Sequence, residues 1–258
     1  MSYEYESLVE EYSIDDVRRD LKNVVSYFRS LPYHEHAMDL FLVQYREMPY
    51  QVADMTDAFC VDEDLRPMDL PEWMHQKSLG VVIFNEYLTM AGRCVFPVKA
   101  PNGTIAGFVG WDPTVDPKYL DSKNYGYKAK TTLLYGMENI EEYYKSKEPV
   151  FITEGLQCTN YLRLHGFHAM STLGSNLTPY YVQILKRFGR RLYMIPDYDE
   201  AGEHFLKQIK YKLPMANSIM VRKGKDIDGC RREHEEELLK ELSMITNPMI
   251  KTNLIMRR

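Results

Sequence analysis

The chain has 258 residues, of which 45% are hydrophobic and 27% are charged, and its formal net charge at pH 7 is -5. This length and apolar content are sufficient for one large or two modest domains, so the composition predicts a globular protein. No stretch approaches the run of about 18 apolar residues that a membrane-spanning helix needs, and the acidic residues 1–6 are unlike a signal or transit peptide. We therefore expect no membrane association and a location in the cytoplasm.

The cysteines and histidines show no metal-ligand spacing. The four cysteines are far apart in the chain, no two of them form a CxxC pair, and no histidine stands at zinc-finger spacing from them. We therefore expect no zinc site and no disulfide framework, and thiols that are reduced and at least partly buried. The cysteines are Cys60, Cys94, Cys158 and Cys230.

The first half of the chain is predicted to begin with helices and to continue with antiparallel strands. Apolar residues recur at helical spacing through residues 1–75. From about Gly80 they form short runs instead, and the Pro-Asn-Gly turn at 101–103 is typical of a link between two antiparallel strands. The predicted helices cover residues 17–28, 37–48 and 52–59, and the predicted strands cover residues 81–84, 94–98 and 104–109.

A basic, tyrosine-rich segment follows these strands. Between Lys118 and Lys130 there are four lysines against one aspartate, interleaved with three tyrosines. Such a patch suits a phosphate backbone whose bases stack on the neighbouring rings. The alternative is a lysine-rich loop that is simply solvated. The lysines are Lys118, Lys123, Lys128 and Lys130, and the tyrosines are Tyr119, Tyr125 and Tyr127.

Strands and helices alternate in the second half of the chain. This order predicts right-handed crossovers and a mainly parallel sheet flanked by helices. The loops after the carboxyl ends of such strands share one edge of the sheet, where α/β proteins bind ligands. A charged helix ends the pattern, and residues 231–239 are expected to be a solvated helix end. The predicted strands cover residues 150–153, 167–170, 192–195 and 218–221.

Acidic residues follow three of these four strands. Glu154 ends the first, Asp197 and Asp199 follow the third, and Asp226 and Asp228 follow the fourth. Carboxylates that converge on one edge repel one another unless cations lie between them. Carboxylate oxygens suit hard ions such as Mg²⁺ or Mn²⁺, so we predict that these five acids form a metal site. The alternative for residues 197–199 alone is a solvated turn that caps the next helix.

Segments around these acids resemble a known family. Residues 151–155, 196–202 and 224–228 are similar to the Toprim domain, which bacterial-type primases, type IA and II topoisomerases and some nucleases share. Upstream segments resemble, in order and spacing, the RNA polymerase domain of DnaG-type primases, which topoisomerases and Toprim nucleases lack. The upstream segments are residues 92–98, 103–110, 117–122 and 130–136.

The resemblance implies a domain order and roles for single residues. It implies a helical and antiparallel-β basic part at 1–146, an α/β Toprim metal-binding domain at 147–242, and a tail at 243–258. Glu154 matches a general-base or metal-supporting glutamate, so Glu154, Asp197 and Asp199 are the expected catalytic residues, served by two or more Mg²⁺ or Mn²⁺ ions. The residues expected to bind nucleotide phosphates and the primer-template are Arg93, Lys118, Lys130 and, from the basic patch, Lys128.

The chain departs from the family pattern at two positions. Cys158 stands where the family usually has an aspartate, which removes one outer acid. Trp111 stands where the family commonly has an arginine; an indole is able to stack on a base but not to pair with phosphate. A zinc ribbon and a helicase-binding domain are also missing from the pattern, so the chain resembles an isolated polymerase core, as expected in a phage replication system within a bacterial host.

The expected function is therefore that of a DNA primase that synthesises short RNA primers on single-stranded DNA from ribonucleoside triphosphates. The expected partners are a replicative helicase or a separate zinc-bearing protein that recognises the template. Two alternatives stay open: a Toprim nuclease, which needs the acids but not the lysines, and a non-catalytic subunit that binds single-stranded nucleic acid or another replication protein.

Overall fold

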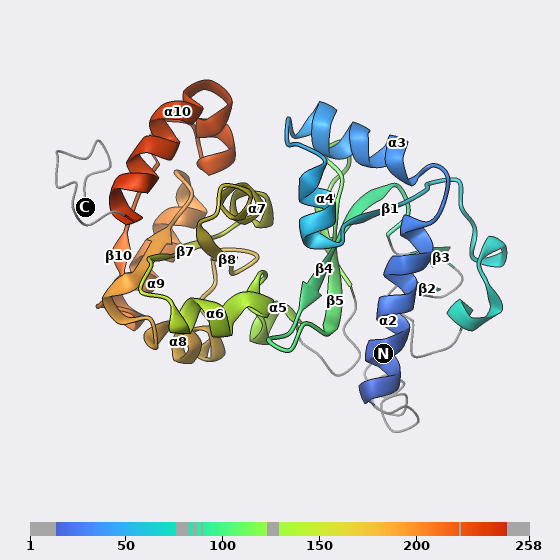
Figure 1. The fold of residues 1–258 in the computed structure, drawn as a ribbon, viewed down its shortest axis with the longest axis horizontal. Coiled ribbons are helices and arrows are strands. Elements are labelled where there is room, and N and C mark those ends of the chain that lie inside the picture. The colour runs from blue at the N-terminus through green and yellow to red at the C-terminus, as the bar shows by residue number, and fades with distance from the viewer. Residues whose placement is uncertain are drawn as a thin grey trace. The chain divides into compact units, whose positions relative to one another are not determined.

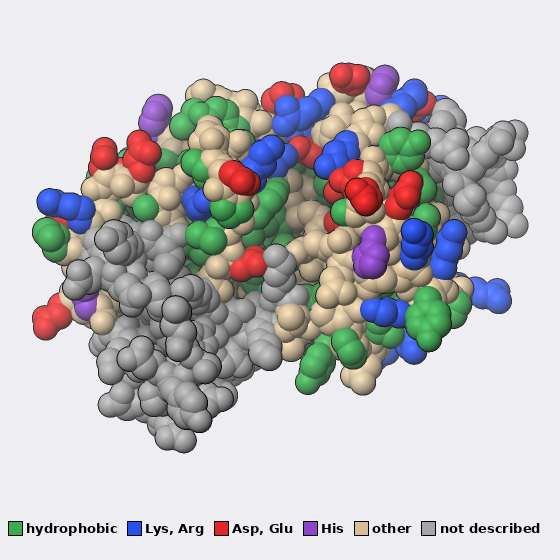
Figure 2. All heavy atoms as spheres, turned by 180° about the vertical axis from the view of Figure 1, so that it is seen from behind, with side chains coloured by type: hydrophobic (Ala, Val, Ile, Leu, Met, Phe, Trp, Pro, Cys, Tyr) green, Lys and Arg blue, Asp and Glu red, His purple; other side chains and the backbone are tan. Residues whose placement is uncertain are grey.

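The chain divides into two compact units, Met1–Ala129 and Lys130–Arg258, each with its own sheet (Figure 1). The structure is a computed structural model that describes residues 14–75, 83–84, 87–88, 90–122, 129–221 and 223–246. Within these residues, no helix is both long and apolar enough to cross a membrane. Acidic and basic side chains both lie on the face shown in Figure 2, as the counts of 37 Asp and Glu and 32 Lys and Arg predict.

The first unit is built on a four-stranded sheet in the order β1-β4-β5-β6, with antiparallel neighbours throughout. A short antiparallel pair, β2 and β3, stands apart from it. The elements are α2 (Ile14–Arg29), α3 (His34–Met38), the π-helix η1 (Asp39–Tyr45), α4 (Gln51–Thr56), β1 (Phe59–Val61), the short 3-10 helices η2 (Pro67–Asp69) and η3 (Glu72–His75), β2 (Ile83–Phe84), β3 (Tyr87–Leu88), β4 (Arg93–Lys99), β5 (Ile105–Trp111) and β6 (Tyr119–Asp121).

Helices cover both faces of this sheet. On one face, the apolar stripe of α2 packs against β1 and β5, and the ring of Phe28 stacks on Phe59 with centroids 5.2 Å apart. On the other face, the Met38 sulfur contacts Cys60 and the Phe41 ring meets Trp111. Successive side chains of a strand point to opposite faces, so one short strand serves both layers. Each fully buried side chain of this size contributes about 1.5–3 kcal/mol to stability.

The predicted elements of the first unit are mostly confirmed, with one correction. The helix predicted for residues 52–59 ends at Thr56, because Asp57 adopts a left-handed conformation with φ 57° and the chain then enters β1. The Arg29 guanidinium donates to the carbonyls of Ala53 and Ala58, which satisfies acceptors on both sides of this turn. Of the run predicted as a strand at 81–84, the first two residues lie outside the described part.

The second unit contains a four-stranded sheet in the order β10-β9-β7-β8, and all its neighbouring pairs are parallel. This confirms the predicted α/β class, although only Ser218 of the strand predicted at 218–221 lies in a strand, the two-residue β10. The elements are α5 (Ala129–Thr132), which spans the boundary, the 3-10 helix η5 (Met137–Asn139), α6 (Ile140–Lys145), β7 (Val150–Thr153), α7 (Leu156–Leu164), β8 (His168–Ser171), α8 (Pro179–Lys186), the 3-10 helix η6 (Gly189–Arg191), β9 (Leu192–Ile195), α9 (Glu200–Lys212), β10 (Asn217–Ser218) and α10 (Ile227–Thr246).

Helices also enclose the parallel sheet. Val150 and Ile152 of β7 face a core to which α6, α8 and α9 contribute. Phe151 points to the opposite face, where α7 lies over the sheet and α10 packs on α7 (Figure 1). This arrangement leaves the carboxyl ends of β7 and β9 at one edge, so the residues that follow them are neighbours in space.

The second unit begins earlier than residue 147, where the sequence places the Toprim domain. Tyr135 pairs with Ser171 as an isolated β-bridge, and Met137, Ile140 and Tyr143 enter the core of this unit. Residues 130–146 therefore pack with the parallel sheet. The functional boundaries at 146/147 and 242/243 stay predictions, and residues 247–258 of the predicted tail lie outside the described part.

Candidate metal-binding site at the sheet edge

Glu154 is fixed at the centre of the sheet edge, directly after β7. Its side chain is buried, and its Oε1 accepts the backbone N–H of Asp197 at 2.9 Å. Its carbonyl oxygen accepts hydrogen bonds from the Ser171 hydroxyl and the Gly174 N–H. Burial, with a further contribution from the charge of Asp199, raises the pKa of Glu154 above its ordinary value. The carboxylate is therefore held in a defined position, and its ionised form is destabilised.

Asp197 is the most strongly perturbed acid of the edge. Burial raises its pKa most, and the charges of Glu154, Asp226 and Asp199 raise it further, to about 7. Gly202 makes the approach of this loop to α9 possible, because a Cβ atom at that position would lie 1.8 Å from the Asp197 carbonyl oxygen. Because a carboxylate among three other carboxylates is repelled by their charges, a divalent cation bound there reduces the repulsion.

Asp199 combines two roles. Its Oδ1 accepts the Gly202 N–H at 2.9 Å and so caps the N-terminus of α9, as the capping alternative for residues 197–199 predicts. Its Oδ2 lies 2.8 Å from the Nζ of Lys225. The hydrogen bond to Lys225 is the main reason why the pKa of Asp199 lies below its ordinary value. The ionised form of Asp199 is therefore stabilised, whereas the ionised form of Asp197 is destabilised.

Asp226 and Asp228 differ from each other in their partners. Asp226 Oδ1 accepts the Gly229 N–H at 2.7 Å, close to the start of α10. Asp228 is buried and its Oδ1 lies 2.8 Å from Nη2 of Arg231, whose side chain is only 5% exposed. The charge of Asp228 is therefore balanced by Arg231, which suits a supporting role better than direct coordination of a metal ion.

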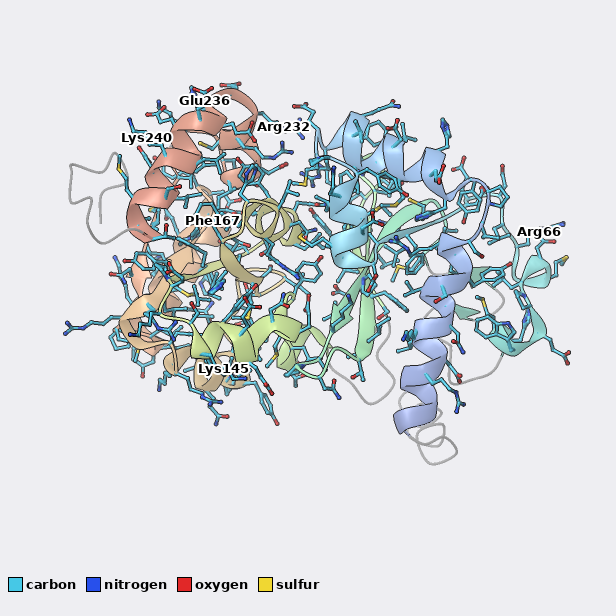
Figure 3. The ribbon with its side chains drawn as sticks, viewed as in Figure 1. Arg66, Lys145, Phe167, Arg232, Glu236 and Lys240 are labelled. Atoms are coloured by element: carbon cyan, nitrogen blue, oxygen red, sulfur yellow. The ribbon has the colours of Figure 1, made fainter. Side chains whose placement is uncertain are left out.

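The buried Arg231 corrects one sequence prediction. Residues 231–239 were expected to be a solvated helix end, yet Arg231 and Leu238 are buried. The solvent face of α10 instead carries Arg232, Glu236 and Lys240, four residues apart (Figure 3). The signal for Arg231 was its position three residues after Asp228, a spacing at which side chains meet on a helix.

The acids lie at one edge of the sheet but are not arranged as a complete set of metal ligands. Among the described residues, no group of three or more His, Cys, Asp or Glu side chains is arranged to hold a metal ion. Asp197 nevertheless interacts electrostatically with Glu154, Asp199 and Asp226. The predicted metal and catalytic roles of the five acids stay predictions, and the geometry supports Glu154, Asp197 and Asp226 most directly.

Cys158 lies behind this edge on α7. It is 4% exposed, and burial, with contributions from Asp226 and Asp197, raises the pKa of its thiol well above its ordinary value. The side chain is therefore a neutral thiol next to the acids. All four cysteines are buried, which confirms the prediction of at least partly buried thiols.

The predicted phosphate-binding residues lie upstream of the acids in the sequence, between Arg93 and Lys130. The Arg93 guanidinium is buried and donates to the carbonyls of Pro117 and Lys118 at 3.1 Å, so it supports the loop that carries the exposed Lys118 side chain. Lys128 lies outside the described residues, as do Lys123, Tyr125 and Tyr127. Lys130 is in α5, but its side chain is outside the described part. The phosphate-binding roles therefore stay predictions.

Trp111 does not have the role that the sequence suggested. Its side chain is 1% exposed, its ring packs edge-on against Phe41, and the Arg46 guanidinium lies 4.4 Å above it. The expectation that this indole is able to stack on a base is wrong, because a ring enclosed in this way has no free face. Tyr119, whose hydroxyl accepts from Arg46, is the partly exposed ring beside it.

The raised pKa of Asp197 predicts how stability changes with pH in the metal-free protein. Between about pH 4 and pH 7 the folded state keeps a proton that the unfolded state has lost, so the free energy of unfolding falls as the pH rises through this range. We expect Asp197→Asn to remove most of this dependence. Thermal unfolding of both proteins in chelator at about pH 5 and about pH 8 measures it. Equal pH dependence of the two proteins would contradict the assignment.

Comparison with known proteins agrees with this geometry. A family model described as Toprim-like matches residues 152–230. A DNA primase of Helicobacter pylori (strain J99) is 31% identical over 140 residues, which are 54% of this chain and 24% of the relative. The chain thus spans about a quarter of that relative's length.

Two solved structures share the fold. The structure of the DnaG catalytic core matches with a TM-score of 0.75 and 20% identity over 90% of this chain and 79% of that chain. The DnaG primase catalytic domain bound to single-stranded DNA matches with a TM-score of 0.72 and 18% identity over 88% and 77%. Residues 152–230 of the chain therefore match a Toprim-like family model, the chain is similar in sequence to DNA primases, and its fold is that of the DnaG catalytic core.

Proposed function

We propose that this protein is a DNA primase that synthesises short RNA primers on single-stranded DNA by metal-dependent transfer of nucleotides. The observation that carries the proposal is Asp197, held beside Glu154 at the carboxyl edge of the parallel sheet with a pKa raised to about 7. Carboxylates crowded in this way favour a bound cation. The relatedness to DNA primases supports nucleotide transfer as the use of that cation.

The donor atoms at the edge fit Mg²⁺ or Mn²⁺. Glu154, Asp197 and Asp226 offer carboxylate oxygens, which hard divalent ions prefer, and Asp199 adds another when Lys225 leaves it. The neighbouring Cys158 thiol is buried and neutral, so it does not favour zinc. We propose that two or more Mg²⁺ or Mn²⁺ ions bind here, and that Asp228 supports the site through its pair with Arg231. When bound, such ions activate the primer 3′-hydroxyl and neutralise the pyrophosphate.

The residues of the chain would position the metal-binding loop and supply positive charge for the phosphates. Glu154 holds the Asp197 loop through its hydrogen bond to the Asp197 N–H, and it is the nearest candidate for a base that accepts the hydroxyl proton. We propose that Lys118, Lys128 and Lys130 bind nucleotide phosphates and the primer-template, and that Arg93 supports this binding. Arg93 serves this role indirectly, because its guanidinium fixes the carbonyls of residues 117 and 118.

The proposed substrates are single-stranded DNA as template and ribonucleoside triphosphates. The similar DnaG catalytic domain was solved bound to single-stranded DNA, which supports this template. We also propose a replicative helicase or a separate zinc-bearing protein as partner, and a location in the cytoplasm of a bacterial host.

A primer-synthesis assay tests the proposal. The protein is incubated with single-stranded DNA, labelled ribonucleotides and either Mg²⁺ or Mn²⁺, alone and with the replicative helicase of its host. We expect oligoribonucleotides that disappear when a chelator is added. If no combination of metal, template and helicase yields a product, the proposal is wrong. Metal-dependent cleavage of the DNA without incorporation would favour the nuclease alternative.

A non-catalytic role is the second candidate. The observations that favour it are the neutral Cys158 beside the acids and the charge of Asp228 that Arg231 already balances. In that case single-stranded DNA would bind with strong salt dependence, and replacing Asp197 or Glu154 would leave both binding and the absence of synthesis unchanged.

A further inference from the structure

Lys225 brings a positive charge to the acidic edge. Its Nζ lies 2.8 Å from Asp199 Oδ2, and it also interacts electrostatically with Asp197 and Asp226. A lysine ammonium among carboxylates acts as a metal cation would, because its positive charge reduces their mutual repulsion. This residue was not singled out from the sequence, since a lysine next to an acid is common on solvated loops.

The backbone around Lys225 is held firmly, whereas its side chain is not. The Lys225 carbonyl oxygen accepts the Tyr198 N–H at 2.6 Å, which ties the two acidic loops together. Gly224 has φ +84°, and a Cβ atom there would lie 2.6 Å from the Cys230 nitrogen, so this loop also packs closely on α10. The Lys225 side chain is 64% exposed. The ammonium can therefore move into solvent without any change in the positions of the carboxylates.

We propose that Lys225 is an exchangeable counter-ion of the metal site: its ammonium pairs with Asp199 in the metal-free protein and leaves when a divalent cation binds. The ammonium and the divalent cation exclude each other, because the ammonium lies within hydrogen-bond distance of an Asp199 oxygen that the metal ion would use. Lys225 therefore weakens metal binding and reduces the mutual repulsion of the free carboxylates until a metal ion arrives. This inference rests on the proposed function, since it assumes that the acids hold a divalent ion.

The test measures Mn²⁺ binding directly, without an activity assay. Metal-stripped protein is titrated with Mn²⁺, and the free ion is quantified by electron paramagnetic resonance. We expect Lys225→Met to bind Mn²⁺ about two- to fivefold more tightly than the wild type, because the competing pair is partly exposed and of modest strength. Lys225→Arg keeps the charge, so its affinity is expected to stay close to that of the wild type.

Lys223 offers a matched control in the same loop. Its ammonium pairs with Glu237 of α10 rather than with the acids of the edge. Lys223→Met therefore removes an equally long basic side chain and its ion pair, and it is expected to leave the Mn²⁺ affinity unchanged. Thermal unfolding of the two Met variants in chelator shows whether either substitution damages the fold.

The outcomes separate this inference from the proposed function. Mn²⁺ affinity that is lost in Asp197→Asn but unchanged or weaker in Lys225→Met would overturn the role of Lys225 and leave the metal site standing. A similar gain in affinity in Lys223→Met would also overturn it, because a general loss of positive charge would then be the cause. A wild-type protein that binds no Mn²⁺ would overturn the metal site and this inference together.

Discussion

Asp197→Asn is expected to reduce primer synthesis at least about 100-fold, because even groups that only support a metal ligand change activity by about 10–100-fold when replaced. Asparagine keeps the size and one oxygen of the side chain but removes its charge. The loop that carries it stays in place, since Glu154 accepts the backbone N–H of residue 197 and Gly202 still admits the close approach of its carbonyl oxygen.

The same substitution is expected to stabilise the metal-free protein. Burial and the charges of Glu154, Asp226 and Asp199 oppose the ionised form of Asp197, so a neutral side chain removes an unfavourable interaction. Lower activity together with a higher melting temperature in chelator would distinguish loss of a functional carboxylate from loss of the fold.

Primer synthesis and thermal unfolding of the two proteins, measured side by side, decide this prediction. Glu203→Gln is the matched control, because Glu203 is an exposed acid in the first turn of α9 whose side chain takes part in none of the described contacts of the edge. Its activity should stay within about twofold of the wild type. An Asp197→Asn protein as active as this control would refute a metal site at Asp197.

Arg231→Met is expected to destabilise the protein by about 3–5 kcal/mol, the range measured when one partner of a buried ion pair is removed. Both partners are largely shielded from solvent, with side chains 5% exposed for Arg231 and 7% exposed for Asp228. The guanidinium also lies 5.4 Å above the Tyr161 ring, so it joins α10 to α7. Its loss leaves the Asp228 carboxylate buried beside the more distant Arg232, 3.7 Å away.

Chemical denaturation of Arg231→Met, Asp228→Asn and the double variant measures the coupling between the two residues. The double variant is expected to recover part of the stability that Arg231→Met loses, because it no longer buries the Asp228 charge without the Arg231 guanidinium. Arg232→Met serves as the control: its side chain is 35% exposed, so we expect a loss of no more than about 1 kcal/mol. A loss of that small size in Arg231→Met would show that Asp228 does not depend on its partner.

The parallel sheet and the place of the acids were readable from local patterns. The apolar runs at 150–153 and 192–195 are strands β7 and β9 with the predicted limits, because a buried strand needs a short continuous apolar segment bounded by turn residues. Once these strands are parallel, Glu154 and Asp197 necessarily follow their carboxyl ends at the same edge.

The partners of individual side chains were not readable in this way. Trp111 and Arg231 both belong to classes of residue that occur at surfaces and in binding sites, and both are buried here by helices that lie elsewhere in the sequence, η1 and α7 respectively. The helix predicted through residue 59 ended early for a similar reason, since Arg29 of α2 binds the carbonyls around the turn.

The sequence by itself determined the order of strands and helices, the alternation that makes the second sheet parallel, and the positions of acids at its carboxyl edge, because these depend on periodicity and on residues close together in the chain. Only the tertiary structure decided that Asp197 is crowded, that Asp199 pairs with Lys225 and that Asp228 pairs with Arg231. Burial and the charges of neighbours from other loops set the protonation and the pairing of a carboxylate, and neither is encoded in its local sequence.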